Sequence, residues 1–380
     1  MRLGVNICEN RIRTRSLSAI SLFSGAGGMD VGFERAGFKV EWANDLNKAA
    51  CATYALNHPG KISCGPIQDF LDSVTQFSGV DLVFGGPPCQ GFSVAGKMDP
   101  DDERSQLLWR FFEVIEIARP AAFVCENVKA LAKLSKWGRV RRRMFERANA
   151  LGYECRLVVL DARHFGVSQG RERMFLLGSR IGGIERTEEA LDAHRCEAPI
   201  LRRLFDGLGK AGSKTNSRTC SAKITIATSP VMRRSPYAGM LFNGQGRPLN
   251  PDGYASTMHA SMGGNKTPII DELHFQGEEP SWIEWYHSHL MNGGTPLGFE
   301  DAPDRLRRLT LDEAIRIQTF PIDYRFYGTQ SQVFTQVGNA VPCDLAWAVG
   351  KVMGELFAGE LSSGIVRSTS SRKKQLALAF

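Results

Sequence analysis

The chain has 380 residues and lacks any uninterrupted apolar stretch long enough to cross a bilayer. Its N-terminus carries scattered arginines but no apolar core segment, so a secretory signal is not expected. CxxC pairs are absent as well, and the nine cysteines are an odd number. These absences argue against a metal site, a disulfide framework and a membrane protein, and they favour a reducing, cytoplasmic setting.

The charge balance favours a polyanionic partner. The formal net charge is +7, and the isoelectric point is near 9.0. Several basic residues cluster in one segment, and they are Lys136, Arg139, Arg141, Arg142, Arg143 and Arg147. This cluster is typical either of a solvated helix face or of a face that contacts phosphates, and both interpretations stay open.

Strand and helix patterns alternate through the first half of the chain. Short apolar runs predict strands at 18–23, 40–43, 80–84, 121–125, 155–160 and 174–178. Helical spacing and stop signals predict helices at 29–36, 47–57 and 107–118. Repeated strand–helix units of this kind indicate an α/β fold with a largely parallel sheet and helices on both faces.

The pattern changes after about residue 182. Residues 210–300 are rich in Gly, Ser, Thr, Asn and Pro, and Trp282, Trp285 and Tyr286 supply apolar anchors. We therefore expect a second, smaller and loop-rich domain rather than a disordered insert. A helix is predicted again at 309–319, where Thr310 can cap and Glu313 follows three residues later.

The motif GGPPCQGFS, residues 85–93, follows the predicted strand 80–84. Its two glycines and two prolines allow neither a continued strand nor an immediate helix, so Cys89 sits on a rigid turn. A buried structural cysteine needs no such turn, whereas a nucleophile needs its sulfur held at a fixed height. Cys89 is therefore a candidate nucleophile at a strand end, where open α/β sheets build their sites.

Two further features predict a cofactor that contains a nucleoside. The turn 23–28, FSGAGG, lies between the first strand and helix, where glycines let the backbone approach a ligand. Asp45 ends the second strand, where an acid can hold ribose hydroxyls. A third spaced glycine and a P-loop lysine are missing, which argues against nucleotide phosphates. The residues alone do not distinguish a dinucleotide from S-adenosylmethionine.

Glu126 lies at another strand end, on the same sheet edge as Cys89. A thiolate can add to an electron-poor ring while a protonated carboxyl assists at a ring nitrogen. Arg171 and Arg173 have a spacing of two, which directs both side chains the same way from an extended chain. They can brace the catalytic loop, grip a phosphate or form a structural ion pair.

Taken together, these segments resemble the DNA (cytosine-5)-methyltransferases of the bacterial modification type. The blocks that carry the resemblance are, in chain order, FSGAGG (23–28), GGPPCQGFS (85–93), ENV (126–128), QGRER (169–173), RRLTLDEAIRIQTFP (307–321) and QVGNAVP (336–342). Their order and spacing fit the family over residues 18–182 and 306–357. The resemblance implies a Rossmann-like methyltransferase fold with a mixed, mostly parallel sheet.

The resemblance also implies a domain organisation. A flexible arm (1–17) precedes the catalytic and cofactor-binding domain (18–182), and a target-recognition domain follows (183–305). A return segment (306–358) completes the catalytic domain, and a flexible tail (359–380) ends the chain.

Roles for individual residues follow from the same resemblance. Cys89 attacks cytosine C6, Glu126 holds the N3 and amino edge of the base, and Arg171 and Arg173 support the pocket. The implied S-adenosylmethionine contacts are Phe23, Ser24, Gly25, Gly27, Gly28, Asp45, Leu46, Pro88, Leu107, Asn339 and Ala340. The candidate DNA contacts are Gln90, Ser93, Arg233, Arg234, Asn243, Gln245, Arg247, Asn265 and Lys266.

The chain departs from the family pattern at two places. Pro66 stands where an acid often holds the adenine amine, and Gln68 or Asp69 is a candidate replacement. Asp45 stands where a glutamate is more usual.

The expected activity is methyl transfer from S-adenosylmethionine to C5 of a flipped-out cytosine in double-stranded DNA. The expected setting is a monomer that belongs to a restriction–modification system or acts alone, with any restriction endonuclease working separately. An RNA cytosine methyltransferase on the same scaffold is the alternative, because one tRNA-modifying branch shares these motifs. A regulator without catalysis is disfavoured by intact Cys89, Glu126, Arg171 and Arg173.

Overall fold

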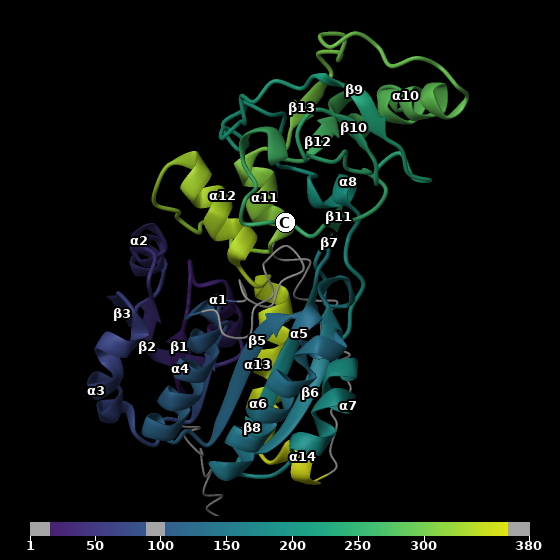
Figure 1. Ribbon diagram of the computed structural model, residues 1–380. Helices are drawn as coiled ribbons and strands as arrows, with labels where there is room; N and C mark the ends of the chain where they lie inside the picture. Colours follow the sequence, from purple (N-terminus) through teal and green to yellow (C-terminus); the bar gives the residue numbers. More distant parts are fainter. Residues whose placement is uncertain (1–15, 89–102, 364–380) are drawn as a thin grey trace, which may run out of the picture.

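The computed structural model describes residues 16–88 and 103–363. In Figure 1 these residues form a lower lobe built on one large sheet and an upper lobe of short elements and loops. The segment that links the lobes on the N-terminal side passes through residues 194–200, and the chain returns through helix α13 (Cys343–Phe357).

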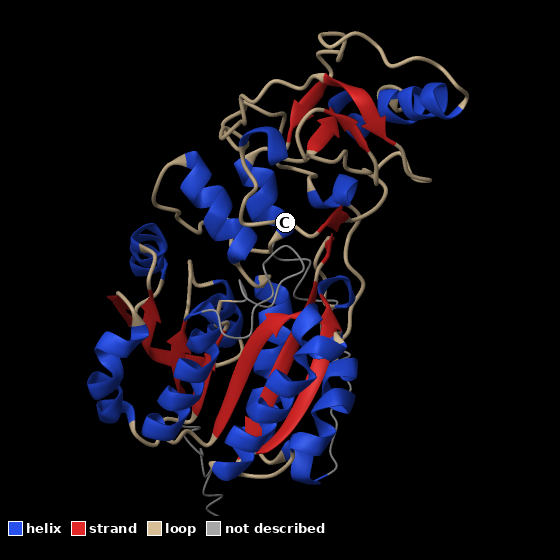
Figure 2. Ribbon diagram, viewed as in Figure 1, coloured by secondary structure: helices blue, strands red, loops and turns tan. Residues whose placement is uncertain are grey.

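A seven-stranded sheet forms the centre of the lower lobe (Figure 2). Its strands, in spatial order, are β3 (Lys61–Cys64), β2 (Phe38–Asp45), β1 (Leu17–Leu22), β4 (Leu82–Gly85), β5 (Ala122–Val128), β8 (Glu172–Ser179) and β6 (Glu154–Asp161). All neighbours are parallel except β8, which is antiparallel to both β5 and β6. The predicted mixed, mostly parallel sheet is confirmed, and β3 is an additional strand that the sequence analysis did not include.

Helices cover both faces of this sheet, as predicted. One face packs against α1 (Gly28–Arg35), α7 (Thr187–Ala193) and α13, and it buries Phe33, Phe84 and Val349. The other face packs against α4 (Glu103–Ala118) and α6 (Gly138–Ala150), and it buries Phe111 and Phe123. The remaining helices of this lobe are α2 (Lys48–Asn57), α3 (Leu71–Val74), α5 (Lys129–Lys133) and α14 (Glu360–Ser363).

Helix α13 is joined to the first helix of the chain by close packing. A Cβ on Gly32 of α1 would lie 2.5 Å from the Cβ of Ala346, so the two helices approach at a glycine. This contact brings the end of the chain back onto its beginning, with Ala346, Val349 and Met353 buried against the sheet. The return segment therefore contributes to the core of the lower lobe.

The upper lobe contains short strands and helices around two apolar clusters. Its elements are α8 (Leu201–Leu204), β9 (Ile226–Val231), β10 (Met240–Phe242), β12 (Ile269–Asp271), α9 (Glu272–Gln276), α10 (Trp282–Met291), β13 (Leu306–Arg308), α11 (Leu311–Ile317) and α12 (Gln330–Asn339). Tyr286 and Ile283 of α10 are fully buried with Phe242 of β10. Of the expected apolar anchors, Tyr286 and Trp282 thus belong to a packed, loop-rich unit, whereas Trp285 is 54% exposed.

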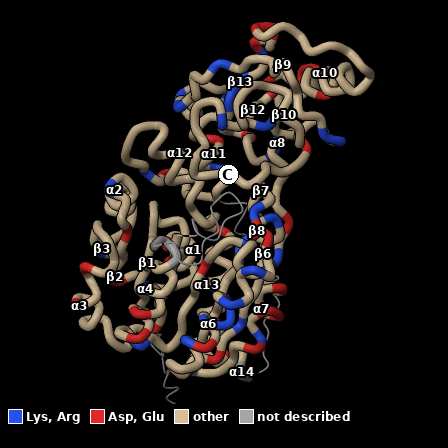
Figure 3. Tube along the Cα trace, in the orientation of Figure 1, with Lys and Arg blue, Asp and Glu red and all other residues tan. Residues whose placement is uncertain are grey.

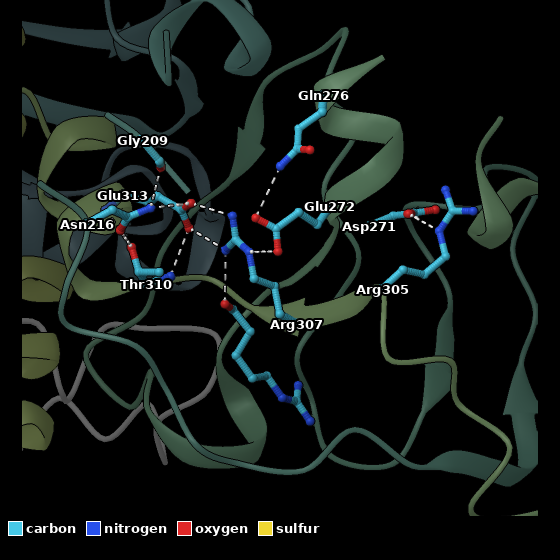
Figure 4. Close-up of polar contacts among 10 residues, drawn as sticks. Gly209, Asn216, Asp271, Glu272, Gln276, Arg305, Arg307, Thr310 and Glu313 are labelled. Atoms are coloured by element: carbon cyan, nitrogen blue, oxygen red, sulfur yellow. Dashed lines mark hydrogen bonds and ion pairs between the residues drawn. The ribbon is translucent and has the colours of Figure 1, made fainter. Parts of the chain in front are cut away.

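A buried network around Glu313 joins the upper lobe to the start of the return segment (Figure 4). The Thr310 hydroxyl accepts from the Glu313 backbone N–H at 3.0 Å, and the Glu313 carboxylate accepts from the Thr310 backbone N–H at 2.8 Å. This is the predicted capping box, and α11 begins there. Arg307 donates to Glu313 and to Glu272, so its strand is tied to both α11 and α9.

The contacts around residue 306 cross the expected domain boundary. Strand β13 pairs with β12 of the preceding segment, and Ile270 packs in one cluster with Leu309 and Ile317. The division at 305/306 stays a prediction, and the upper lobe as packed includes the residues up to α12.

The basic cluster of residues 136–147 lies on and before α6, at the outer side of the lower lobe (Figure 3). Part of it has partners within the chain. Arg141 donates to the carbonyls of Leu131 and Leu134, and the Arg143 guanidinium lies over the Trp109 ring at 4.4 Å. These contacts indicate that Arg141 and Arg143 have a structural role.

Candidate active site

The site residues come together at one edge of the sheet. β1, β2, β4 and β5 are parallel, so their carboxyl ends meet at the same edge, which faces the upper lobe (Figure 1). The turn 23–28 follows β1, Asp45 ends β2, Pro88 lies beyond β4, and Glu126 lies near the end of β5. Open α/β sheets bind ligands at this edge.

Asp45 holds the first half of the glycine turn. Its Oδ2 accepts from the Gly25 backbone N–H at 2.8 Å, and its Oδ1 accepts from the Asn47 N–H at 2.7 Å. Burial raises the pKa of Asp45, and the hydrogen bonds from Asn47 and Gly25 oppose that shift. Each carboxylate oxygen keeps a second lone pair, so Asp45 can still accept from a ligand hydroxyl.

The glycines of the turn serve different purposes. Gly25 has φ +56°, and a Cβ placed on it would meet nothing within 4 Å, so its outer side is open. A Cβ on Gly27 would lie 2.2 Å from His58 Nε2, and one on Gly28 would lie 2.7 Å from the Val341 carbonyl oxygen. Gly25 therefore leaves room in front of the turn, while Gly27 and Gly28 let it pack against the protein behind.

The other expected cofactor residues differ in exposure. Phe23 is half-buried and has φ +54°, an unusual backbone conformation for a residue with a side chain. Leu46 is 67% exposed, which is unusual for a large apolar side chain next to a site. The half-buried residues are Ser24, Pro88, Leu107 and Ala340, and Asn339 is exposed. An open glycine turn, an acid and exposed apolar side chains fit an adenosine-containing ligand.

The position of the unusual Pro66 lies beside the same strand edge. The Asn44 amide donates to the carbonyl of Gly65 at 3.0 Å, so this turn is tied to the end of β2. Gln68 and Asp69 are both exposed nearby in the sequence and so stay available to a ligand.

Glu126 is placed against the segment that leads to Cys89. A Cβ on Gly86 would lie 2.7 Å from Glu126 Oε2, so only glycine leaves space for the carboxyl there. The neighbouring Asn127 donates from its amide to the Pro87 carbonyl at 3.1 Å. Cys89, Gln90 and Ser93 themselves lie outside the described residues, but the chain is fixed beside Glu126 up to Pro88.

Burial raises the pKa of the Glu126 carboxyl, although Arg173 and Arg171 act in the opposite direction. Arg173 Nε lies 3.0 Å from Glu126 Oε1, and the Glu126 side chain is 12% exposed. The net shift favours the protonated acid more than in water. A carboxyl in this state can donate a hydrogen bond to a base and transfer a proton to it.

The two arginines have different partners. Arg173 pairs with Glu126, whereas Arg171 is 2% exposed and donates to the carbonyls of Met258 at 2.9 Å and Gly338 at 3.0 Å. A guanidinium buried among carbonyls does not reach a DNA phosphate. Of the three roles considered for the pair, the structure supports an ion pair for Arg173, whereas the carbonyls that accept from Arg171 lie in the segments of Met258 and Gly338 and not in the described part of the 85–93 motif.

Arg171 belongs to a joint between the lobes. Strand β7 (Gln169–Gly170) pairs in parallel with β11 (Ala255–Ser256) of the upper lobe. The Gln169 amide donates to Gln318 at 3.0 Å, and its oxygen accepts from the Met258 N–H at 2.9 Å. The QGRER motif therefore connects three segments that are far apart in the sequence.

Two of the segments with candidate DNA contacts lie side by side in the upper lobe. The backbone N–H groups of Gln245 and Gly246 both donate to the Asn265 carbonyl, at 3.2 and 3.1 Å. Gln245, Arg247, Asn265 and Lys266 are all exposed. Their side chains therefore form one polar, basic surface.

The remaining candidate DNA contacts differ from this pair of loops. The Asn243 amide donates to the Thr225 hydroxyl at 3.0 Å and to the Ile226 carbonyl at 2.7 Å, so both of its hydrogens have partners within the chain. Arg233 and Arg234 are exposed in the connection between β9 and β10, and the Arg233 carbonyl lies 2.8 Å from His287 Nε2 of α10.

His259 is a candidate that the sequence analysis missed. It follows β11, and its pKa is lowered by partial burial and by the charges of Arg171, Arg173 and Arg247. Its backbone packs against the return segment, because a Cβ on Gly338 would lie 2.3 Å from the His259 carbonyl oxygen. No local motif marks it, because its neighbours come from distant parts of the chain.

Within residues 16–88 and 103–363, no three His, Cys, Asp or Glu side chains are grouped as metal ligands. None of the helices in those residues is long and apolar enough to span a membrane.

The mixed, mostly parallel sheet, the glycine turn with its acid and the carboxyl at the sheet edge fit an S-adenosylmethionine-dependent methyltransferase. The family model "C-5 cytosine-specific DNA methylase" matches residues 17–355, and the chain belongs to this family. It is an enzyme that methylates cytosine at C5 in DNA with S-adenosylmethionine as cofactor.

Named relatives agree with this membership. The Type II methyltransferase M.FnuDI of Fusobacterium nucleatum is 32% identical, over 89% of this chain and 94% of its own. M.PspPI of a Psychrobacter strain is 34% identical, over 90% of this chain and 79% of its own. The crystal structure of a Spodoptera frugiperda DNMT2 variant superposes with a TM-score of 0.62 at 16% identity, covering 90% of this chain and all of that one, and it supports the fold.

Proposed function

We propose that this enzyme methylates one cytosine within a specific double-stranded DNA sequence through a covalent bond between Cys89 and cytosine C6. The observation that supports this most directly is the Glu126 carboxyl, which lies against Gly86 at the start of the Cys89 segment and pairs with Arg173. A proton donor is thus held beside Gly86, three residues before the expected nucleophile in the sequence, and addition to a pyrimidine ring requires both groups.

The reaction begins with a base that has left the duplex, because C5 and C6 are inaccessible within the stack. The Cys89 thiolate forms a bond to C6, the C5=C6 π electrons move toward N3, and Glu126 gives its proton to N3. C5 thereby becomes nucleophilic. Arg173 holds the Glu126 carboxyl at 3.0 Å and stabilises the carboxylate left after proton transfer.

Bound S-adenosylmethionine supplies an electrophilic methyl group to C5. The open turn at Gly25 and the Asp45 carboxylate would hold this cofactor at its ribose, and Phe23 and Leu46 would contact its adenine. A base then removes the C5 proton, the C5=C6 bond re-forms as the S–C6 bond breaks, and the N3 proton returns to the Glu126 carboxylate. Cys89 leaves as a thiolate, and the product is 5-methylcytosine.

We assign the choice of sequence to residues 183–305, and in particular to the loops of Gln245, Arg247, Asn265 and Lys266. Long polar side chains on adjoining exposed loops suit base reading in the major groove. Because the named relatives are Type II methyltransferases, we propose that this enzyme protects DNA alongside a separately acting endonuclease. We also propose that it acts in the cytoplasm and as a monomer.

The test is methylation by the purified enzyme with radiolabelled S-adenosylmethionine and three substrates: plasmid duplex, its denatured strands and bulk tRNA. We expect label in the duplex, and bisulfite sequencing should place 5-methylcytosine at one recurring sequence. Label confined to tRNA would favour the RNA methyltransferase, and methylation of every cytosine context would contradict sequence choice by residues 183–305.

A further inference from the structure

A chain of buried polar groups runs behind the glycine turn. The Tyr324 hydroxyl donates to the Ala26 carbonyl oxygen within the turn. His58 Nε2 lies 2.8 Å from the same hydroxyl oxygen, and His58 Nδ1 lies 2.9 Å from Glu34 Oε2. His58 caps the end of α2, Glu34 belongs to α1, and Tyr324 follows α11. These hydrogen bonds therefore join three separate segments to the turn.

The hydrogen atoms in this series of hydrogen bonds can be assigned by counting donors and acceptors. A carbonyl oxygen only accepts, so the single Tyr324 hydrogen is used at Ala26. His58 Nε2 must then donate to the Tyr324 oxygen. At Nδ1, His58 lies 2.9 Å from a Glu34 carboxyl oxygen. Donation from both ring nitrogens, to Tyr324 and to Glu34, requires the imidazolium form of His58.

The surroundings of His58 favour that charge. From α1, Asp30 and Glu34 face it and raise its pKa, although burial acts to lower it; the net direction is upward. Asp30 is itself fully buried with a pKa of about 6, and it accepts from the Tyr54 hydroxyl at 2.9 Å. From α2, the Tyr54 ring stacks on His58 at 4.2 Å.

Solvent reaches the outer end of the chain through a small cleft. The cleft has a volume of about 270 Å³, and its polar and charged lining includes Glu34, Arg35, Asn57, His58, Asp323 and Tyr324. Arg35 is paired with Asp344 at 2.7 Å, which leaves Glu34 as the ion-pair partner of His58. The His58 side chain is itself 1% exposed, and its partner Glu34, 28% exposed, connects it to this cleft.

The imidazole also determines where the turn can lie. A Cβ on Gly27 would be 2.2 Å from His58 Nε2 and 2.7 Å from the Tyr324 hydroxyl, so the turn rests directly on both side chains. Asp45 holds Gly25 from the front, while Tyr324 and His58 hold Ala26 and Gly27 from behind. The turn is thus fixed from both sides.

We propose that His58 and Tyr324 are positioning residues for the cofactor turn, and that S-adenosylmethionine binds more weakly once His58 loses its proton. This inference rests on the proposed function of residues 23–28 as the cofactor turn. When His58 is neutral, it can no longer donate to both Glu34 and Tyr324. Its single remaining N–H then goes to the Glu34 carboxylate, and the bare Nε2 competes with the Ala26 carbonyl for the one Tyr324 hydrogen, so the hydrogen bond that holds the turn is weakened.

The test measures the dissociation constant of S-adenosylmethionine by calorimetry from pH 6 to pH 9, together with kcat at saturating cofactor. For Tyr324→Phe we expect weaker binding by about 5- to 10-fold, as for the loss of one hydrogen bond, and kcat within about 2-fold. Tyr327→Phe is the matched control, because Tyr327 is 59% exposed on the same segment and should bind as wild type does.

The histidine is tested by His58→Gln. A glutamine amide can still donate to Tyr324 but does not titrate, so the variant should keep most of its affinity and lose the extra weakening of wild type at high pH. NMR titration of the His58 ring should give a pKa above the ordinary value of about 6.5 in wild type, and Glu34→Gln should lower it. This titration needs no cofactor.

Three outcomes overturn the inference. One is Tyr324→Phe with wild-type affinity, another is the same pH dependence in wild type and His58→Gln, and the third is an NMR pKa below the ordinary value. If wild type itself fails to bind S-adenosylmethionine, the proposed cofactor site is wrong as well. Circular dichroism melting of each variant separates lost binding from lost folding, and His58→Gln stays informative where Tyr324→Phe does not fold.

Discussion

Replacing Glu126 by glutamine separates proton donation from every other contact that this residue makes. The amide has nearly the same shape, and its oxygen can still accept from Arg173, whose Nε lies 3.0 Å from Glu126 Oε1. Glutamine also fits beside Gly86, where the present oxygen would be 2.7 Å from an added Cβ. We therefore expect a folded variant with nearly unchanged affinity for S-adenosylmethionine.

The expected loss is in the chemical step. A positioned general acid contributes about 10²–10⁴-fold to a rate, so single-turnover methylation by Glu126→Gln should slow by at least about 100-fold. Because burial raises the pKa of Glu126, the protonated acid is present below its folded-state pKa and is lost above it. The wild-type rate should consequently carry a falling limb on the alkaline side that the variant lacks.

The assay is rapid-quench transfer of labelled methyl to a duplex that contains the target site, measured from pH 5.5 to pH 9. The control is Glu172→Gln, which changes the neighbouring glutamate that lies exposed and pairs with Lys129 at 2.6 Å. It should retain the wild-type rate. A Glu126→Gln variant within about 3-fold of wild type would refute the acid role and leave Glu126 as a structural partner of Arg173.

Three further predictions concern the nucleophile, the joint between the lobes and sequence choice. Cys89→Ala should abolish methylation while cofactor affinity stays near wild type, and wild type should form a denaturation-resistant adduct with 5-fluorocytosine DNA; turnover by the variant would disprove covalent catalysis. Arg171→Lys should lower the free energy of unfolding by about 2–4 kcal/mol in urea titrations, because Arg171 donates to the Met258 and Gly338 carbonyls from two separate nitrogens, which the single nitrogen of lysine does not replace, whereas Arg173→Lys should act mainly on the rate. Arg247→Ala should relax one position of the methylated sequence at a cost of about 1–3 kcal/mol there, as read by sequencing the products, and a uniform loss at all sites would instead identify a phosphate contact.

Local patterns accounted for much of the fold because they report local physics. The apolar runs located β1, β2, β4, β5, β6 and β8, and the Thr310–Glu313 spacing located the start of α11. The antiparallel direction of β8 could not be predicted in the same way. It depends on which neighbours a strand pairs with, and strand pairing is decided between segments distant in sequence.

The residues of the candidate site likewise differ in whether the local sequence predicts their role. Motif spacing alone named Glu126, Asp45 and the glycine turn, because each is positioned by the strand that it ends or follows. Motif spacing did not distinguish the role of Arg171 from that of Arg173. Arg171 donates to two carbonyls that lie 87 and 167 residues away in the sequence. Motif spacing also did not reveal that both Asn243 amide hydrogens are used within the chain.

The sequence by itself determined the family, the chemistry at C5 of cytosine and the order of the segments that perform it, because the reaction requires certain residue types on certain turns. Tertiary structure decided which side chains support those turns. His58 and Tyr324 are 266 residues apart and carry no motif, yet they meet at one hydroxyl oxygen behind the glycine turn. Contacts of this kind depend on burial and on three-dimensional packing, which no local pattern encodes.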